Sequence, residues 1–206
     1  MRFQQIYDWI ETNKPEVICE VGTWNGLNAA QMMSFGAKQY IGFDLWEDGD
    51  EVIDELENNS KKRVPMETAE KNLKKHKIEL IKGNTRDTLK AYAKDKAPFI
   101  DMALIDGGHS KGTIKSDLLA ILRIVKRNGV IFIDDFYFGC KDDSIGAQSA
   151  LVDFNVPFTV LPMGDKARGN MIVKVVKIAL RDVPTLGKWD IPSKIAWQFN
   201  PPLEAA

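Results

Sequence analysis

The residues best suited to chemistry lie in two short motifs in the second half of the chain. One motif reads Ile105-Asp106-Gly107-Gly108-His109, and the other reads Ile133-Asp134-Asp135. Each motif follows a run of apolar residues that is typical of a buried strand in a parallel sheet. Ligands of open α/β sheets bind outside the carboxyl ends of the strands. We therefore expect three carboxylates and one imidazole at that edge of the sheet.

The three acids in these motifs predict a metal site. If the two strands are neighbours, they lie about 4.8 Å apart and their acids can share one ion. Clustered carboxylates repel one another unless a cation lies among them. An all-oxygen donor set with no nearby cysteine favours Mg²⁺ over Zn²⁺. The predicted metal ligands are Asp106, Asp134 and Asp135. The alternative is that Asp134 or Asp135 caps a turn and that no metal binds.

A second candidate site lies near the start of the chain, where an apolar run at 17–21 leads into a loop with glycines at 22 and 26. A dinucleotide loop would need G-x-G-x-x-G, but Trp24 and Leu27 stand where glycine is required. The loop therefore suits a ligand without phosphates. Asp44, at the end of the next apolar run, can accept both hydroxyls of a ribose. A nucleoside without phosphate indicates S-adenosylmethionine.

Alternating apolar strands and amphipathic helices must position these residues. Strands are expected at 17–21, 39–44, 78–82, 99–106, 130–134, 158–161 and 171–177, and helices at 3–13, 27–35, 66–76, 85–95, 112–126 and 145–154. The last two strands, joined by a loop at 164–169, predict an antiparallel hairpin. The fold class is therefore α/β, a Rossmann-like doubly wound sheet of seven strands that is mostly parallel with an antiparallel C-terminal hairpin edge.

Over residues 15–177 the sequence resembles class I S-adenosylmethionine-dependent methyltransferases. Glu20 to Gly26 (Glu-Val-Gly-Thr-Trp-Asn-Gly) is similar to their first motif, E-x-G-x-x-x-G, and Asp44 matches their ribose-binding acid. The helix that follows is close to the G-x-S-A of catechol-type O-methyltransferases, with Asn28 in place of the serine. The resemblance implies that the loop surrounds the methionine part and that Gly83 and Asn84 lie near the adenine. The cofactor-binding residues expected are Glu20, Gly22, Thr23, Trp24, Asn25, Gly26, Asp44, Asn84 and Asp106.

A narrower resemblance links the two acidic motifs to the metal-dependent macrolide-sugar O-methyltransferases, which have an I-D-G-x-H and an I-D-D strand end. It implies that Asp106, Asp134 and Asp135 bind magnesium and that His109 is the base, so that His109 and Asp106 are the expected catalytic residues. A metal lowers the pKa of a coordinated hydroxyl, and an imidazole of ordinary pKa (about 6.5) can take its proton. The alternative for His109 is a loop residue hydrogen-bonded to backbone.

Length and composition are consistent with one domain. Residues 1–178 are expected to form it, with a lid insertion or an oligomer contact at 45–65 and an irregular Pro- and Trp-containing tail at 179–206. A net charge of −1 gives no reason to expect nucleic acid as a partner. No apolar run approaches the ~20 residues that span a bilayer. The two cysteines are expected to be reduced thiols, as in a cytoplasmic protein.

The function expected is Mg²⁺-dependent O-methylation of a sugar or another small hydroxylated molecule, in a protein that could form a homo-oligomer. Three alternatives remain open: a metal-free methyltransferase, a dinucleotide-dependent oxidoreductase, and a non-catalytic module that binds S-adenosylmethionine. Trp24 argues against the oxidoreductase, and the group of His109 with three acids argues against the non-catalytic module.

Overall fold

The computed structural model describes residues 3–57, 62–154, 157–162, 166–168 and 171–180. The predicted tail at 179–206 therefore lies almost entirely outside the described residues. So does part of the loop predicted at 164–169 and part of the segment predicted to be a lid at 45–65. Among the described residues, no helix has the length and apolar character needed to cross a bilayer.

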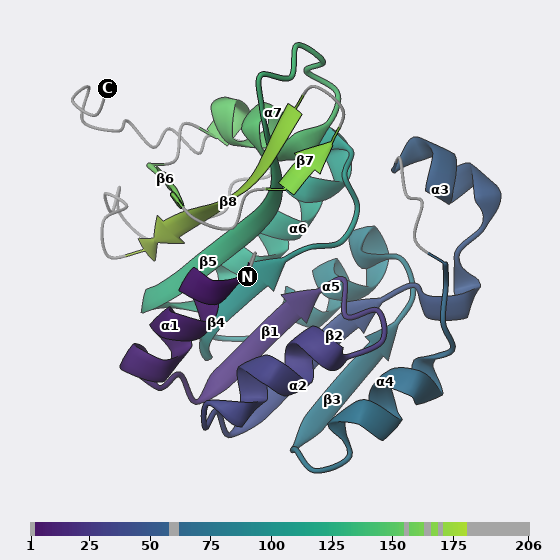
Figure 1. Ribbon diagram of the computed structural model, residues 1–206. Helices are drawn as coiled ribbons and strands as arrows, with labels where there is room; N and C mark the ends of the chain where they lie inside the picture. The colour runs from purple at the N-terminus through teal and green to yellow at the C-terminus, as the bar shows by residue number, and fades with distance from the viewer. Residues whose placement is uncertain (1–2, 58–61, 155–156, 163–165, 169–170, 181–206) are drawn as a thin grey trace.

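A mixed sheet in the order β3-β2-β1-β4-β5-β8-β6 forms the centre of the molecule (Figure 1). Strands β1 to β5 are mutually parallel, whereas β8 is antiparallel to both β5 and β6. The strands are β1 (Val17–Val21), β2 (Gln39–Asp44), β3 (Ile78–Lys82), β4 (Ile100–Ile105), β5 (Val125–Phe138), β6 (Thr159–Val160), β7 (Lys166–Arg168) and β8 (Met171–Ala179). The predicted fold class and the predicted antiparallel edge are confirmed.

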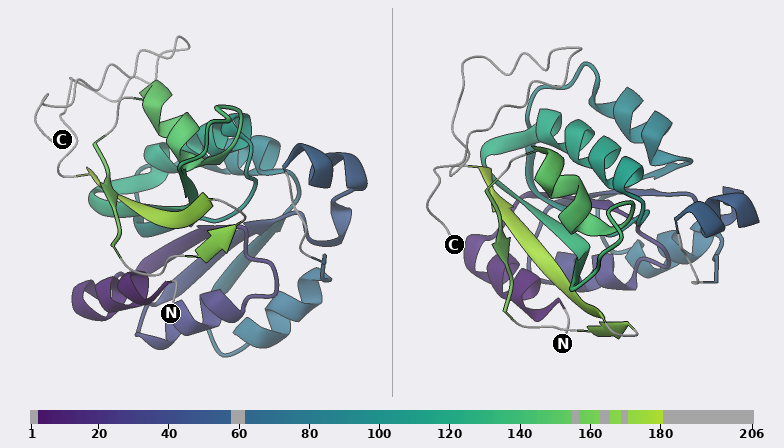
Figure 2. Two further views of the ribbon diagram at one scale, coloured as in Figure 1. Left: turned by 45° about the horizontal axis from the view of Figure 1, so that its top comes forward. Right: turned by 90° about the horizontal axis from the view of Figure 1, so that it is seen from above.

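Helices cover both faces of this sheet, and Figure 2 shows the two layers on opposite sides of it. One layer contains α1 (Gln4–Asn13), α2 (Leu27–Ser34) and α4 (Met66–Leu73), and the other contains α5 (Thr85–Ala93), α6 (Lys111–Ile124) and α7 (Gly146–Phe154). Because both faces of the central strands are covered, β1 and β4 are buried along almost their whole length. Their continuous apolar sequences follow from this double burial. The segment after β2 forms a 3-10 helix (Trp46–Asp48) and α3 (Glu51–Leu56), which projects beyond the carboxyl edge of the sheet.

Two strands differ from the expectation. β5 begins at Val125 rather than at 130, since Val125 pairs with Ile100 of β4 before the register shifts to the Met102–Val130 pair. The Asn128-Gly129 turn is thus an irregularity within the strand. The strand also continues past 134, because residues up to Phe138 pair with β8. The short strand β7, which pairs with β8, occupies part of the stretch predicted to be a loop at 164–169.

The loop after β1 is held tightly between the ends of the neighbouring strands. The amide of Gly22 donates to the carbonyl of Phe43 at 2.8 Å, and the amide of Asp106 donates to the carbonyl of Val21 at 2.8 Å. A Cβ atom at position 22 would lie 2.1 Å from the carbonyl oxygen of Asp106, and Gly22 has φ of +94°. Only glycine satisfies both conditions. This close approach places the first loop directly beside the end of β4.

We expect Gly22→Ala to lower the free energy of unfolding by more than about 3 kcal/mol, because the added methyl group must displace backbone. Gly36→Ala is the matched control. Gly36 also has a positive φ of +103° but no atom within 4 Å of its Cβ position, so it should lose only about 1–2 kcal/mol. Urea unfolding of both variants measures the difference. Equal losses would show that backbone conformation alone, and not the contact with Asp106, requires glycine at position 22.

Candidate active site

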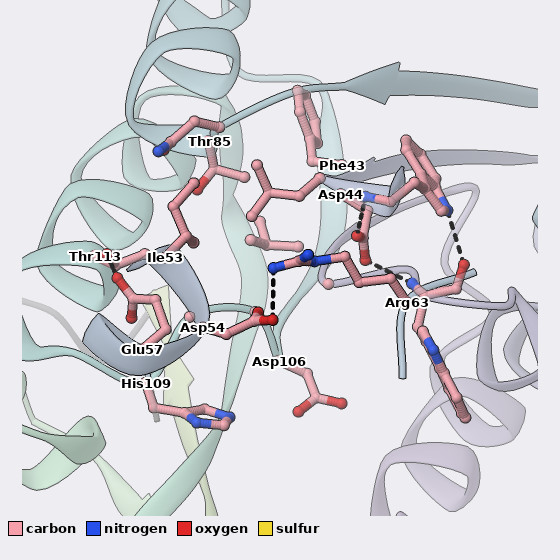
Figure 3. Close-up of a pocket in the computed structure, with 18 of the residues that line it drawn as sticks. Phe43, Asp44, Ile53, Asp54, Glu57, Arg63, Thr85, Asp106, His109 and Thr113 are labelled. Carbon is pink, nitrogen blue, oxygen red and sulfur yellow. Dashed lines mark hydrogen bonds and ion pairs between the residues drawn. The ribbon is translucent and has the colours of Figure 1, made fainter. Parts of the chain in front are cut away.

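A pocket opens at the carboxyl ends of β1, β2 and β4 (Figure 3). Its walls come from the loop after β1, the end of β2, α3, residues 62–64, the start of α5 and the loop after β4. The lining residues are Val21, Gly22, Trp24, Phe43, Asp44, Leu45, Trp46, Ile53, Asp54, Glu57, Lys62, Arg63, Val64, Asn84, Thr85, Asp106, Gly107, Gly108, His109 and Thr113. The pocket therefore lies at the edge of the sheet where the sequence predicts ligand binding.

Five of the predicted cofactor-binding residues line this pocket. They are Gly22, Trp24, Asp44, Asn84 and Asp106. The other four do not line it: Glu20 lies in β1, and Thr23, Asn25 and Gly26 belong to the loop itself. The binding of a cofactor by these nine residues remains a prediction. The structure divides them into a set that faces the pocket and a set that supports the loop.

The supporting set is organised around Glu20, which is 1% exposed. Its carboxylate accepts hydrogen bonds from the Tyr40 hydroxyl at 2.5 Å and from Nδ2 of Asn28 at 2.7 Å. Burial, and then the Glu20 charge, hold the pKa of Tyr40 well above its usual value, so the phenol remains a donor. Thr23 also contacts the Tyr40 hydroxyl, at 2.9 Å. Glu20 thus fixes the loop from below.

Asp44 joins the two tryptophan-containing segments of the pocket wall. Its carboxylate accepts from the backbone amide of Trp24 at 2.6 Å and from that of Trp46 at 2.8 Å. Both tryptophans have positive φ, +48° and +47°. The indole of Trp46 donates to the carbonyl of Trp24, and the indole of Trp24 donates to the carbonyl of Lys62. These bonds fix the direction in which the Asp44 carboxylate faces the pocket.

The three predicted metal ligands meet beside this pocket. Ligand atoms of Asp106, Asp134 and Asp135 lie within 4.8 Å of one another. Successive side chains of a regular strand point to opposite faces, so adjacent aspartates would normally diverge. Here the β5–β8 register shifts between Ile133 and Phe136, and Asp135 has φ of +56°. A bulge with backbone strain of this kind is characteristic of functional sites, and it brings both carboxylates towards Asp106.

The donor set of this cluster fits a hard divalent cation. All three groups are carboxylates, and Asp134 and Asp135 are 1% and 8% exposed, so water screens their mutual repulsion poorly. Mg²⁺ prefers oxygen ligands from a small number of carboxylates. The three aspartates predicted from sequence are therefore suitable ligands for this ion.

His109 lies between the acidic cluster and the pocket. Its Nε2 atom is 3.0 Å from Oδ2 of Asp135, and its backbone carbonyl accepts from the amide of Gly146 at 2.8 Å. Within the described part of the chain, the buried Nδ1 atom has no hydrogen-bond partner. The side chain is therefore oriented by a carboxylate rather than by backbone, in contrast to the alternative left open above.

The sequence did not single out the pocket residues contributed by the segment after β2. Ile53 and Asp54 face the pocket from α3, and Glu57 faces it from the residue after α3 (Figure 3). Arg63 pairs with Asp54 at 2.5 Å. The run of acids between 47 and 57 is visible in the sequence, but most of its members are exposed. Nothing local distinguishes the buried member, Glu57, from the exposed ones, because its partners lie more than 50 residues away.

Comparisons with known proteins are consistent with this geometry. A family profile described as "Methyltransferase domain" matches residues 19–136, more than half of the chain. Three of the similar solved structures are described by their sequence identity, their TM-score and the share of each chain that is covered. TomG, an O-methyltransferase from Streptomyces achromogenes in complex with SAM and involved in tomaymycin synthesis, has 14% identity and a TM-score of 0.59, with 85% of this chain and 78% of that chain covered. An O-methyltransferase from Bacillus cereus in complex with SAH has 13% identity and a TM-score of 0.60, with 85% and 79% covered. An rRNA methylase from Streptococcus thermophilus has 15% identity and a TM-score of 0.58, with 87% and 96% covered. No curated protein matches the chain.

One further acid, Asp117, is fully buried in α6 behind the pocket. Burial raises its pKa to about 7, and the Glu57 carboxylate adds to the increase. The Thr85 hydroxyl and the Arg86 guanidinium offset part of it. Between pH 4 and 7 the folded protein thus keeps a proton that the unfolded chain releases. Asp117 should therefore make the protein less stable as the pH rises through this range.

We expect Asp117→Asn, which cannot ionise, to remove this dependence. The free energy of unfolding of the variant minus that of the wild type should increase by roughly a few kcal/mol from pH 5 to pH 8. Each pKa unit corresponds to about 1.4 kcal/mol. Urea unfolding at the two pH values measures it, and taking the difference cancels the contributions of all other groups. A difference that is the same at both pH values would contradict the raised pKa of Asp117.

Proposed function

The chain belongs to the methyltransferase-domain family and is an S-adenosylmethionine-dependent methyltransferase, and on this basis we propose that it methylates a hydroxyl oxygen of a small molecule with the help of Mg²⁺. The observation that carries the proposal is the meeting of Asp106, Asp134 and Asp135 at the tips of β4 and β5, next to the pocket and in contact with His109. Similar structures described as O-methyltransferases support oxygen as the acceptor atom.

The pocket has the chemistry expected for the methyl donor. S-adenosylmethionine carries a sulfonium and an ammonium group, and four carboxylates line the pocket, those of Asp44, Asp54, Glu57 and Asp106. We assign the ribose hydroxyls to Asp44, whose carboxylate is already oriented by two backbone amides. The adenine is assigned to the Asn84 side of the pocket and the methionine part to the Gly22–Trp24 side.

The residues around the acidic cluster would align the acceptor hydroxyl and remove its proton. Mg²⁺ held by the three aspartates would lower the pKa of an acceptor hydroxyl placed beside it. Asp135 orients the His109 ring through Nε2, and we assign the proton of the acceptor hydroxyl to this imidazole. The acceptor oxygen then forms a bond to the methyl carbon as the carbon–sulfur bond breaks. The products are the methyl ether, S-adenosylhomocysteine and a protonated His109.

Aromatic residues that follow the acidic pair in the chain support a sugar or another ring-containing small molecule as the acceptor. Phe136 and Phe138 follow the acidic pair directly on β5, and Phe138 is 61% exposed. The Phe136 ring lies 5.7 Å from that of Phe158. A net charge of −1 gives no support for a nucleic-acid acceptor.

Donor binding should depend on Asp44. We expect Asp44→Ala to raise the dissociation constant of S-adenosylhomocysteine by about 10- to 100-fold, because a charged acceptor of hydrogen bonds is lost. Isothermal titration calorimetry gives the constant. Asp48→Asn is the control, since Asp48 is exposed and pairs with Lys82 outside the pocket. A dissociation constant within twofold of the wild-type value for Asp44→Ala would contradict the ribose assignment.

Metal dependence is tested with Asp134→Asn, which keeps the shape of the side chain but removes a charge. Wild-type protein should bind Mg²⁺ in calorimetry, the variant should not, and methyl transfer to a hydroxylated acceptor should fall by more than about 100-fold. EDTA should abolish wild-type transfer, and added Mg²⁺ should restore it. Asp143→Asn, on an exposed loop residue, is the control. Transfer that survives EDTA would favour the metal-free alternative.

A further inference from the structure

We propose that Glu57, contributed by the segment between β2 and α4, is a positioning residue that holds the His109 loop in its active arrangement. Glu57 follows α3 and is 7% exposed, although its neighbours Glu55 and Leu56 are exposed. Its carboxylate points away from α3 towards the start of α6 and lies next to His109 in the pocket wall (Figure 3). The catalytic part of this inference rests on the function proposed above.

Three hydrogen bonds connect Glu57 to the first turn of α6. The backbone amide of Ser110, the residue after His109, donates to Oε2 at 2.7 Å. The hydroxyls of Ser110 and Thr113 donate to Oε1 at 2.9 and 2.5 Å. The amide can only donate, and the carboxylate accepts all three bonds, one at Oε2 and two at Oε1. The positive end of the helix dipole favours a carboxylate at this place as well.

This arrangement is a capping box whose acid comes from a distant segment. In a local capping box, the N-cap serine accepts from the amide of residue N3, and a Glu or Gln at N3 accepts from the N-cap amide. Ser110 is the N-cap of α6 and accepts from the Thr113 amide at 3.2 Å. Position N3 is Thr113, which supplies no carboxylate, and Glu57 takes that role. Arg86 donates to the Thr113 hydroxyl at 2.8 and 3.0 Å and completes the cluster.

The loop itself is built around the Glu57 carboxylate. A Cβ atom at Gly108 would lie 2.6 Å from Oε2 of Glu57 and 2.7 Å from a Thr113 methyl group. On its other side, the loop is tied to residues 144–146 by the His109 carbonyl–Gly146 amide bond and the Lys111 amide–Ser144 carbonyl bond. His109 is thus fixed between two supports, one of which is Glu57. The segment that covers the donor pocket therefore also determines where the base lies.

The first test is independent of catalysis and uses amide hydrogen exchange of the full-length protein. Glu57→Gln replaces charge-assisted hydrogen bonds to Ser110 and Thr113 by weaker neutral ones, so we expect exchange at the Ser110 amide and in the first turn of α6 to accelerate by about tenfold. Glu55→Gln removes the same charge from the same segment at an exposed position and should leave exchange unchanged. Unchanged exchange in Glu57→Gln would overturn the inference, whatever reaction the protein catalyses.

The second test measures methyl transfer at saturating donor and acceptor. Glu57→Gln should lower kcat by about tenfold, because small misplacements of a base slow proton transfer strongly. Glu57→Asp keeps the charge but is one methylene shorter, so its kcat should lie between those of the wild type and Glu57→Gln. This variant also keeps the test valid if Glu57→Gln does not fold. The positioning role would be overturned by a kcat within twofold of the wild-type value. It would also be overturned if a saturating donor concentration restored the wild-type rate of methyl transfer. Wild-type protein that methylates no hydroxylated acceptor would refute the proposed function and leave the exchange result standing.

Discussion

Electrostatic repulsion among three carboxylates is the constraint around which the ends of β4 and β5 are organised. Asp106, Asp134 and Asp135 converge within 4.8 Å at the ends of two central strands, and the latter two are almost buried. Such a group is unfavourable without a compensating cation. The fold nevertheless maintains it through a β-bulge and a left-handed backbone at Asp135. The strain and the convergence of the three carboxylates support the proposal that a cation binds there.

The loop after β1 and the acidic cluster are coupled through the backbone. Gly22 at the end of β1 packs against the carbonyl of Asp106 at the end of β4. Because β1 and β4 are hydrogen-bonded neighbours, the loop that would hold the methyl donor and the strand that presents the first acid cannot move independently. Glu57 extends the same coupling to His109 from a segment that lines the pocket. Alignment of a methyl group with an acceptor oxygen requires rigidity of this kind.

Much of this arrangement was predictable because it depends on local patterns in the sequence. The apolar runs give β1, β2 and β3 at their observed bounds, and strand ends with acids identify Asp44, Asp106 and Asp134. What was not predictable depends on contacts between distant segments. The extension of β5 to Phe138 is imposed by pairing with β8. The burial of Glu57 is imposed by Ser110 and Thr113, and the role of Glu20 beneath the loop is imposed by Tyr40.

The central claim, that the three aspartates hold a divalent cation beside the methyl donor, is tested most directly by crystallography with Mn²⁺ in place of Mg²⁺. Crystals grown with Mn²⁺ and S-adenosylhomocysteine should give an anomalous peak at the carboxylates of Asp106, Asp134 and Asp135, with the thioether in the adjacent pocket. Mn²⁺ suits the same oxygen ligands as Mg²⁺. Occupied S-adenosylhomocysteine without an anomalous peak at these carboxylates, at Mn²⁺ concentrations that saturate ordinary magnesium sites, would contradict the account.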